Sequence, residues 1–197
     1  MRLILASASP RRAEILRNAG FVFDVVPADV DETMLPGEAP EDYVQRLALA
    51  KARVAAKQVQ VGTGAAIIIG ADTAIAMEGQ ALGKPSGAED VRRMLGLLSG
   101  KTHEVLTGLS VLSVPDGREA RHVERTRVTF VQLRDEDIEG YLATGEPLDK
   151  AGAYAIQGIG GKFVSRIEGC YFNVIGLPLS RLWRMLRTLG WKDSRSI

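Results

Sequence analysis

One carboxylate stands in the middle of an otherwise strongly apolar stretch, residues 65–77. The stretch is rich in β-branched residues, a pattern typical of a strand covered on both faces, and Asp72 lies near its centre. An ionised carboxylate in such a strand destabilises the fold unless it is paired, binds a metal or opens into a wet cleft. Asp72 is therefore our first candidate for a catalytic group, and a salt-bridged core residue is the alternative.

Two arginines stand at the start of a predicted helix over residues 10–19, where cations are disfavoured. Ser9 is a typical N-cap and proline suits the first helical position; Arg11 and Arg12 follow in the first turn. The positive end of the helix dipole opposes them unless an anion binds there. Free backbone N–H groups and two guanidinium groups together indicate a phosphate site. Arginines that point into solvent or pair with nearby acids are the alternative.

Two lysines and one acid complete the charged candidates. Lys51 falls on the apolar face of a predicted helix over residues 40–57, so it leans toward the interior, although snorkelling to the surface is the commoner fate. Lys84 follows a predicted hairpin turn that returns the chain to the level of Asp72. Glu32 lies in an acidic loop and matters only if phosphate chemistry needs a divalent metal, which prefers carboxylate oxygens.

A glycine-rich polar segment, residues 146–161, is too long to be only a connection and contains Gln157. Such loops on a compact domain are often binding elements. The two histidines, His103 and His122, lie in no metal-binding spacing. We expect both histidines to be structural.

The elements that must position these groups are helices and strands in mixed order, which predicts an α/β fold. The expected strands cover residues 3–6, 21–26, 65–77, 105–114, 122–133, 162–168 and 170–175, the last two forming a hairpin. Besides those already named, helices are expected after an N-cap at Ser86, over residues 135–143 and from Pro178 onward. We expect the tail from Lys192 to be frayed.

Composition limits the partners. Lys and Arg number 25 and Asp and Glu 24 in 197 residues, a net charge of +1, so no bulk field attracts nucleic acid or a membrane. The single Cys170 allows no internal disulfide and suits a reducing cytoplasm. No apolar run approaches the ~18 residues of a membrane span, and no secretory signal is found. We expect a cytoplasmic protein with no nucleic-acid or membrane partner.

Several motifs occur together in a distinctive order along the chain. They are Leu3–Arg12 (LILASASPRR), Gly70–Thr73 (GADT) with Leu82–Pro85 (LGKP), Lys101–Val105 (KTHEV), Asp149–Gly158 (DKAGAYAIQG) and Asn173–Pro178 (NVIGLP). In these motifs the chain resembles the Maf family of nucleotide pyrophosphatases, from residue 3 to about 190. The resemblance implies a Maf-like (ITPase-like) α/β fold, an elongated mixed β-sheet flanked by helices. It also implies one domain over residues 1–197, with two lobes around a cleft.

The activity that the resemblance implies is hydrolysis of a nucleoside triphosphate to the monophosphate and pyrophosphate by a homodimer that uses Mg²⁺ or Mn²⁺. The segment 149–158 resembles the branch that acts on dTTP and UTP, and modified pyrimidine nucleotides are further candidates. A nucleotide-binding regulator of cell division and septum formation, which acts through a partner without turnover, is the alternative.

The resemblance also assigns roles by position. Asp72 matches the proton acceptor and Glu32 a supporting carboxylate; Arg11, Thr73 and Gln157 match positions of substrate choice; and Ser9, Arg12, Lys51 and Lys84 match phosphate contacts. Because phosphate chemistry of this kind needs a divalent metal, we expect Asp72, together with Glu32, to hold it.

Overall fold

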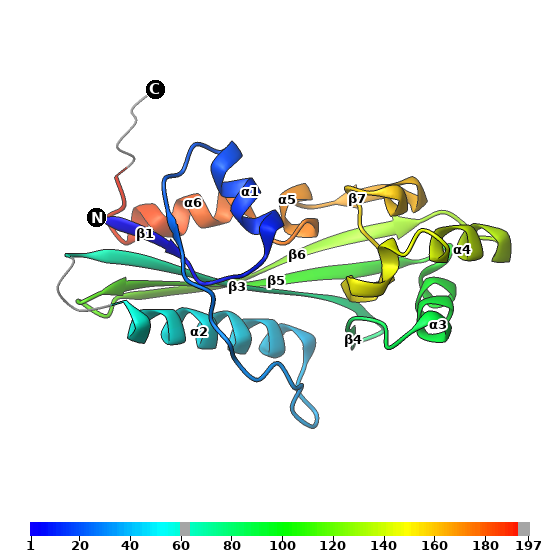
Figure 1. Ribbon diagram of the computed structural model, residues 1–197, viewed down its shortest axis with the longest axis horizontal. Coiled ribbons are helices and arrows are strands. Elements are labelled where there is room, and N and C mark those ends of the chain that lie inside the picture. Colours follow the sequence, from blue (N-terminus) through cyan, green and yellow to red (C-terminus); the bar gives the residue numbers. More distant parts are fainter. Residues whose placement is uncertain (60–63, 193–197) are drawn as a thin grey trace.

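A mixed sheet of seven strands forms the centre of the computed structural model, which describes residues 1–59 and 64–192 (Figure 1). The strands are β1 Arg2–Leu5, β2 Asp24–Val25, β3 Ala66–Met77, β4 Gln80–Leu82, β5 Thr102–Val114, β6 Glu119–Phe130 and β7 Val164–Glu168. Their order is β2-β1-β3-β5-β6-β7, with β4 paired to β3. β1 pairs in parallel with β2 and β3, whereas the other pairings are antiparallel. The predicted elongated, mixed α/β sheet is confirmed.

Helices cover both faces of this sheet. They are α1 Pro10–Asn18, α2 Pro40–Gln58, α3 Ala88–Leu98, α4 Asp135–Leu142, α5 Tyr171–Val174 and α6 Leu179–Thr188, with short 3-10 turns at Glu146–Asp149, Ala151–Ala153 and Ile159–Phe163. α2 lies along one face, and α1 and α6 lie on the other (Figure 1). α3 and α4 stand together at the far end of the sheet (Figure 1). The division into two lobes stays a prediction.

Side-chain alternation along β3 decides which face each residue serves. Ile67 and Ile69 pack in the same core cluster as residues of α1 and α6. Ile68 packs with Ala52 and Ala55 of α2 on the opposite face. Because successive residues of a strand point to opposite faces, the same alternation directs Asp72 toward α2 and Thr73 toward α1.

α2 approaches the sheet so closely that its backbone lies against glycine. A Cβ added to Gly70 would lie 2.0 Å from the carbonyl oxygen of Ala48, and one added to Gly108 would lie 2.2 Å from that of Val44. Only glycine permits this approach. Lys51 follows Ala48 by one helical turn, so the close packing brings its side chain to the level of Asp72.

The edge of β3 is open along five residues. Pairing with β1 ends at Ile69, and pairing with β4 begins at Ile75. Within the described chain, residues 70–74 therefore have a strand partner, β5, on one edge only. Side chains on both faces of β3 can reach a common space through this gap.

Three local predictions were wrong. Residues 170–175 form no strand: Tyr171–Val174 is the short helix α5, and β7 pairs with β6 instead. The helical turn buries Asn173, whose Nδ2 donates to the carbonyl of Val105 (2.9 Å) and to Oγ1 of Thr126 (3.0 Å).

The other two concern element ends. Ser86 is not an N-cap, because its N–H donates to the Asp90 carboxylate and α3 begins after Gly87. The second strand is shorter than predicted, since only Asp24–Val25 pairs with β1. The predicted frayed tail lies mostly outside the described residues, because residues 193–197 are not among them.

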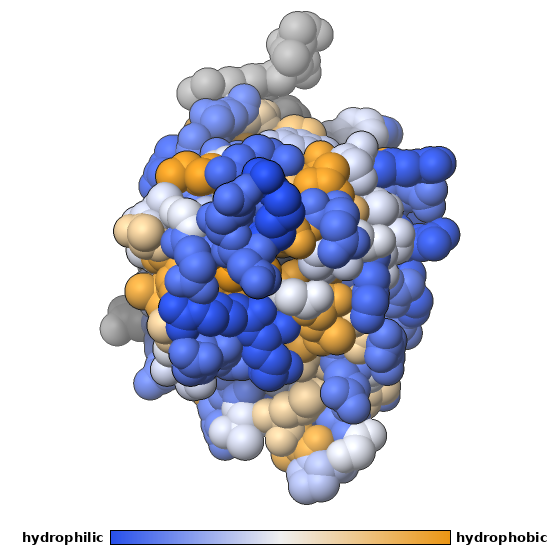
Figure 2. Space-filling view, turned by 90° about the vertical axis from the view of Figure 1, so that its right-hand side faces the viewer, coloured by the Kyte–Doolittle hydropathy of each residue, from blue (hydrophilic) through white to orange (hydrophobic). Residues whose placement is uncertain are grey.

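The end of the molecule formed by α3 and α4 is mostly hydrophilic, with hydrophobic surface in smaller separate areas (Figure 2). An ion pair between Arg92 and Glu139 joins the two helices there. No helix in residues 1–59 and 64–192 combines the length and the apolar character that crossing a membrane requires.

Candidate active site

A cavity of about 1030 Å³ opens at the gap in the β3 edge. Its walls come from the turn after β1, the start of α1, the loop before α2, the first half of α2, the middle of β3, the end of β4 and the glycine-rich segment 146–161. β5 and the end of α5 with the loop after it complete them. Among the predicted site residues it is lined by Ser9, Arg11, Arg12, Glu32, Lys51, Asp72, Thr73 and Lys84. These eight come from several separate segments and lie on one cavity; Gln157 is exposed and is not among the lining residues.

Asp72 forms the most buried charged contact of the cavity. Its Oδ1 lies 2.6 Å from Nζ of Lys51, and the same Nζ lies 2.6 Å from Oε1 of Glu32. Asp72 and Lys51 are only 8% and 7% exposed, whereas the Glu32 side chain is 56% exposed. Tyr43 supports Glu32 by donating its hydroxyl hydrogen to the Glu32 carbonyl, at 2.9 Å. One ammonium group therefore bridges a buried and an exposed carboxylate.

Burial raises the pKa of Asp72 above the ordinary value of an aspartate. The positive charges of Lys51 and Arg12 and the hydrogen bond from Lys51 oppose this rise, while Glu32 adds to it. A carboxylate whose pKa is raised is a better proton acceptor than one in water. Its position on the cavity wall suits a general base.

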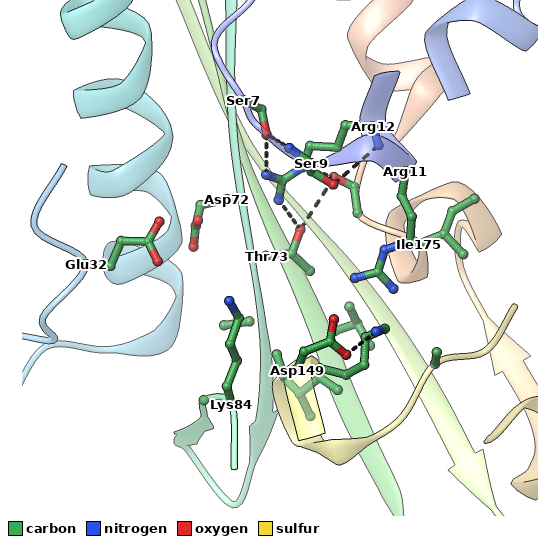
Figure 3. Close-up of a pocket in the computed structure, with 18 of the residues that line it drawn as sticks. Ser7, Ser9, Arg11, Arg12, Glu32, Asp72, Thr73, Lys84, Asp149 and Ile175 are labelled. Atoms are coloured by element: carbon green, nitrogen blue, oxygen red, sulfur yellow. Dashed lines mark hydrogen bonds and ion pairs between the residues drawn. The ribbon is translucent and has the colours of Figure 1, made fainter. Parts of the chain in front are cut away.

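Arg12 fastens three segments to one another on the other side of β3 (Figure 3). Its Nε donates to the carbonyl of Gly176 (2.9 Å), one terminal nitrogen to Oγ of Ser7 (3.1 Å) and the other to Oγ1 of Thr73 (3.0 Å). Oγ1 of Thr73 in turn lies 2.9 Å from Oγ1 of Thr107 on β5. Arg12 thus has a positioning role as well as a charge.

The start of α1 faces the cavity with unused donors. Oγ of Ser9 accepts the N–H of Arg12 at 3.5 Å and so caps the helix as predicted. In the described part of the chain, the side chains of Arg11 and Lys84 make no hydrogen bond or ion pair. Lys84 points into the cavity from the end of β4, on the side of Asp72 (Figure 3). These two cations are the ones most available to an incoming phosphate.

The glycine-rich segment closes the cavity on the side opposite α1. Asp149 and Lys150 line it as an ion pair. Behind them, the Glu146 carboxylate accepts hydrogen bonds from Tyr141 Oη (2.7 Å) and from the N–H groups of Ile159 (3.0 Å) and Gly160 (3.1 Å). Glu146 therefore holds the turn that carries the exposed Gln157.

An apolar wall continues from the charged part of the cavity. It is made by Ile75, Leu82, Val105, Tyr154, Ala155, Ile156, Val174 and Ile175. The hydroxyl of Tyr154 lies 2.9 Å from Nε2 of the buried His103, and the rings of both contact Phe130. His103 is buried and does not line the cavity, and its structural role stays a prediction. A wall of this kind beside a cationic region suits a ligand with a flat apolar part and an anionic part.

Sequence reasoning missed several lining residues, chiefly Ser7, Tyr43, Asp149, Lys150 and Tyr154. Ser7 stands in the serine-rich turn before α1, and Asp149, Lys150 and Tyr154 stand in the glycine-rich segment. The composition of that segment predicts a binding element but does not distinguish its charged pair from the amide of Gln157. No periodicity or spacing distinguishes Tyr43 from other residues of the α2 apolar face.

A divalent cation fits the carboxylate pair, because the ammonium of Lys51 already stands between two carboxylate oxygens as a cation would. The described residues contain no group of three or more His, Cys, Asp or Glu side chains that could hold a metal ion. Mg²⁺ commonly uses one or two carboxylates and completes its shell with phosphates and water. Asp72 and Glu32 match that smaller requirement.

Comparison with known proteins gives consistent matches over nearly the whole chain. The dTTP/UTP pyrophosphatase of Anaeromyxobacter dehalogenans (strain 2CP-C) is 51% identical over 192 residues, 96% of this chain and 95% of the relative. The dTTP/UTP pyrophosphatase of Geotalea uraniireducens (strain Rf4) is 52% identical over 188 residues, 95% of each chain.

Among solved structures, a nucleoside-triphosphatase / dITP/XTP pyrophosphatase from Mycobacterium abscessus (ATCC 19977 / DSM 44196) matches with 16% identity and a TM-score of 0.44, over 98% of this chain and 100% of that one. Residues 2–189 match the family described as "Maf-like protein". By this match and by relatives of about one-half identity, the chain belongs to the Maf family.

Proposed function

We propose that this chain is a nucleoside triphosphate pyrophosphatase that hydrolyses dTTP and UTP to the monophosphate and pyrophosphate. The observation that carries the proposal is the buried Asp72 carboxylate on the wall of a cavity that five cationic side chains also line. Relatives of about one-half identity that bear the name dTTP/UTP pyrophosphatase support the choice of substrate. Modified pyrimidine triphosphates are further candidates.

The chemistry needs a water activated for in-line attack and stabilisation of the charge that develops on the phosphate oxygens. Asp72 Oδ2 would accept the proton of the attacking water, because Oδ1 is already engaged by Lys51. Arg11 and Lys84, which have no bonded partner in the described structure, would hold the triphosphate. Arg12 would face the same phosphates, and its three hydrogen bonds would hold the start of α1 in place against β3.

We further propose that Asp72 and Glu32 hold Mg²⁺ or Mn²⁺. When bound, such a cation neutralises the phosphate oxygens and makes pyrophosphate a better leaving group. The apolar wall around Tyr154 and Ile156 would take the base. Gln157, which carries both an acceptor and donors for the uracil or thymine edge, follows Ile156 directly and would need to turn inward to reach it.

Homodimer formation and a cytoplasmic location are parts of the same proposal. A cavity of this chemistry needs neither a nucleic acid nor a membrane as partner.

A panel of triphosphates tests the proposed function. The purified protein is incubated with Mg²⁺ or Mn²⁺ and each common or modified triphosphate, and products are separated by chromatography. We expect dTTP and UTP to be converted faster than purine triphosphates, with the monophosphate and pyrophosphate as products. Formation of the diphosphate and orthophosphate would contradict the site of cleavage. Nucleotide binding without turnover of any triphosphate would instead support the regulatory alternative.

A further inference from the structure

Lys51 stands where a divalent cation between Asp72 and Glu32 would have to stand. Its Nζ lies 2.6 Å from an oxygen of each carboxylate. Mg²⁺ binds carboxylate oxygens at roughly 2.0–2.1 Å, so a metal shared by the same two oxygens needs the volume that Nζ fills. The ammonium and the metal cannot both bridge these two oxygens.

The side chain of Lys51 can give way without a change in the fold. Its residue is 7% exposed and lies on α2. The backbone of that helix is in direct contact with the glycines of the sheet, where Ala48 meets Gly70. A shift of the whole helix would break this packing, whereas rotation of a flexible lysine side chain keeps it. Exchange of the ammonium for a metal is therefore a local movement toward the cavity.

The charge of the cavity decides when that movement is favourable. Five cations (Arg11, Arg12, Lys51, Lys84 and Lys150) and three carboxylates (Glu32, Asp72 and Asp149) are among its described lining residues. A bare divalent cation would enter a region with an excess of positive charge and would push a further ammonium into it. A metal bound to a triphosphate carries a net negative charge and offers its phosphate oxygens as new partners for the displaced lysine.

We propose that the site takes its divalent cation only as the complex with a nucleoside triphosphate, and that Lys51 moves from the two carboxylates to the phosphates when this complex binds. The ligand class is thus the metal–triphosphate complex, and the free metal is excluded by the protein's own ammonium group. The choice of a nucleoside triphosphate as ligand rests on the proposed function. The displacement of Lys51 rests on its contacts with the two carboxylates.

Binding of Mn²⁺ to the nucleotide-free protein at pH 8, followed by the electron paramagnetic resonance signal of free Mn²⁺, tests the exchange. We expect the parent protein to bind Mn²⁺ weakly and Lys51→Met to bind it at least about tenfold more tightly, because the carboxylates lose their internal cation. Lys51→Arg keeps the charge and should resemble the parent. Lys84→Met is the matched control: it removes the same charge from the same cavity but touches neither carboxylate, and should change the affinity by less than about threefold.

The inference is overturned if Lys51→Met binds Mn²⁺ no more tightly than Lys84→Met. It is also overturned if the nucleotide-free parent binds Mn²⁺ as tightly as Lys51→Met does. Should Lys51→Met fail to fold, the parent still decides the matter: tight Mn²⁺ binding that Asp72→Asn abolishes would refute exclusion of the metal, and weak binding would support it. Turnover of UTP by the parent is measured separately. Turnover without the expected Mn²⁺ pattern refutes this inference alone, and the expected pattern without turnover refutes the proposed function alone.

Discussion

The guanidinium group of Arg12 and the hydroxyl group of Thr73 lie 3.0 Å apart, which fastens the first turn of α1 to the strand residue next to Asp72. Two further bonds from Arg12, to Ser7 and to the carbonyl of Gly176, extend the same junction to the turn after β1 and to the loop after α5. A charge alone would not need three directed bonds. The geometry of this junction and its charge can therefore be separated by mutation.

Arg12→Lys keeps the positive charge but replaces the planar fork with a single ammonium, which cannot serve three diverging acceptors. We expect kcat/KM for UTP to fall about 100-fold and the free energy of unfolding to fall by about 2 kcal/mol. Arg11→Lys is the control, because Arg11 makes no hydrogen bond or ion pair within the described structure; its kcat/KM should fall less than about tenfold. Steady-state kinetics and urea unfolding measure both effects. Equal losses in the two variants would refute the positioning role of Arg12.

Thr107 supports the same junction from behind. It is fully buried, its register partner on β3 is Thr73, and the two hydroxyl oxygens lie 2.9 Å apart. Thr107→Val removes the hydroxyl at nearly constant volume and should lower kcat/KM about fivefold, the effect of one lost hydrogen bond, whereas Thr107→Ser should restore it.

A second threonine pair provides the comparison for Thr107. Thr102 and Thr129 join β5 to β6 with hydroxyl oxygens 2.8 Å apart, and neither lines the cavity. Thr102→Val should leave kcat/KM within about twofold of the parent. If both valine variants lose activity alike, the effect belongs to sheet stability and not to the site.

Asp72→Asn tests the proton acceptor. The amide cannot accept the proton of water, so kcat should fall about 10²- to 10⁴-fold, while a non-hydrolysable UTP analogue should still bind, as calorimetry would show. In the parent, burial raises the pKa of Asp72. Activity should therefore rise with pH through a value above that of an ordinary aspartate, because only the ionised form accepts a proton. Asp72→Asn should lack this limb of the profile; activity within tenfold of the parent would remove Asp72 from the role of base.

Gln157→Glu tests recognition of the base. The added charge and the lost amide donors should weaken kcat/KM for UTP and dTTP about tenfold or more, with a smaller effect on purine triphosphates. Because Gln157 is exposed and does not line the cavity, this variant also tests whether its turn moves inward. A loss that is uniform across all bases would make Gln157 a structural residue.

His103 gives the fold a dependence on pH that the site does not share. Burial lowers the pKa of His103 from 6.5 to about 4, so the unfolded chain binds a proton at pH values where the folded chain does not. The contribution of neutral His103 to the free energy of unfolding is fully present above about pH 6.5 and is lost as the pH falls from there toward 4. By pH 5 the free energy of unfolding should have fallen by about 2 kcal/mol.

Urea unfolding at several pH values measures this dependence. His103→Phe should flatten it between pH 6.5 and 5, because the titrating group is gone. His122→Gln removes the other histidine, which is partly exposed, and most of the slope should remain. If the pH dependence persists in His103→Phe and disappears in His122→Gln, the titrating group is His122 and the prediction is wrong.

The sequence allowed much of the fold to be predicted because its signals were local. The apolar run around Asp72, the cap at Ser9 and the proline after it each predict an element from neighbouring residues, and the structure has these elements. Residues 170–175 were mistaken for a strand because the hydrogen bonds of Asn173 go to residues far away in the chain, Val105 and Thr126. Such contacts leave no trace in local periodicity.

The site was predictable as a set of residues but not as a geometry. Charges in unfavourable places, such as Arg11 at a helix start and Asp72 in a buried strand, indicate residues that the structure places on one cavity, whereas Gln157 lies outside it. That Lys51 bridges Asp72 and Glu32 depends on the close packing of α2 against Gly70, which residue spacing does not reveal. Residue spacing likewise does not reveal that Asp149 and Lys150 line the cavity and Gln157 does not.

Asp72 and Thr73 both lie in the open stretch of the β3 edge, where the strand holds their backbones in one fixed arrangement. Asp72 and Thr73 face different helices, yet they are joined by a single peptide bond within a strand that β5 pairs along its whole middle. Closing or opening of the surrounding loops can bring Lys84 or Lys150 nearer to a ligand, but it leaves the separation between the Cα atoms of Asp72 and Thr73 unchanged. That separation is set by the covalent geometry of the backbone.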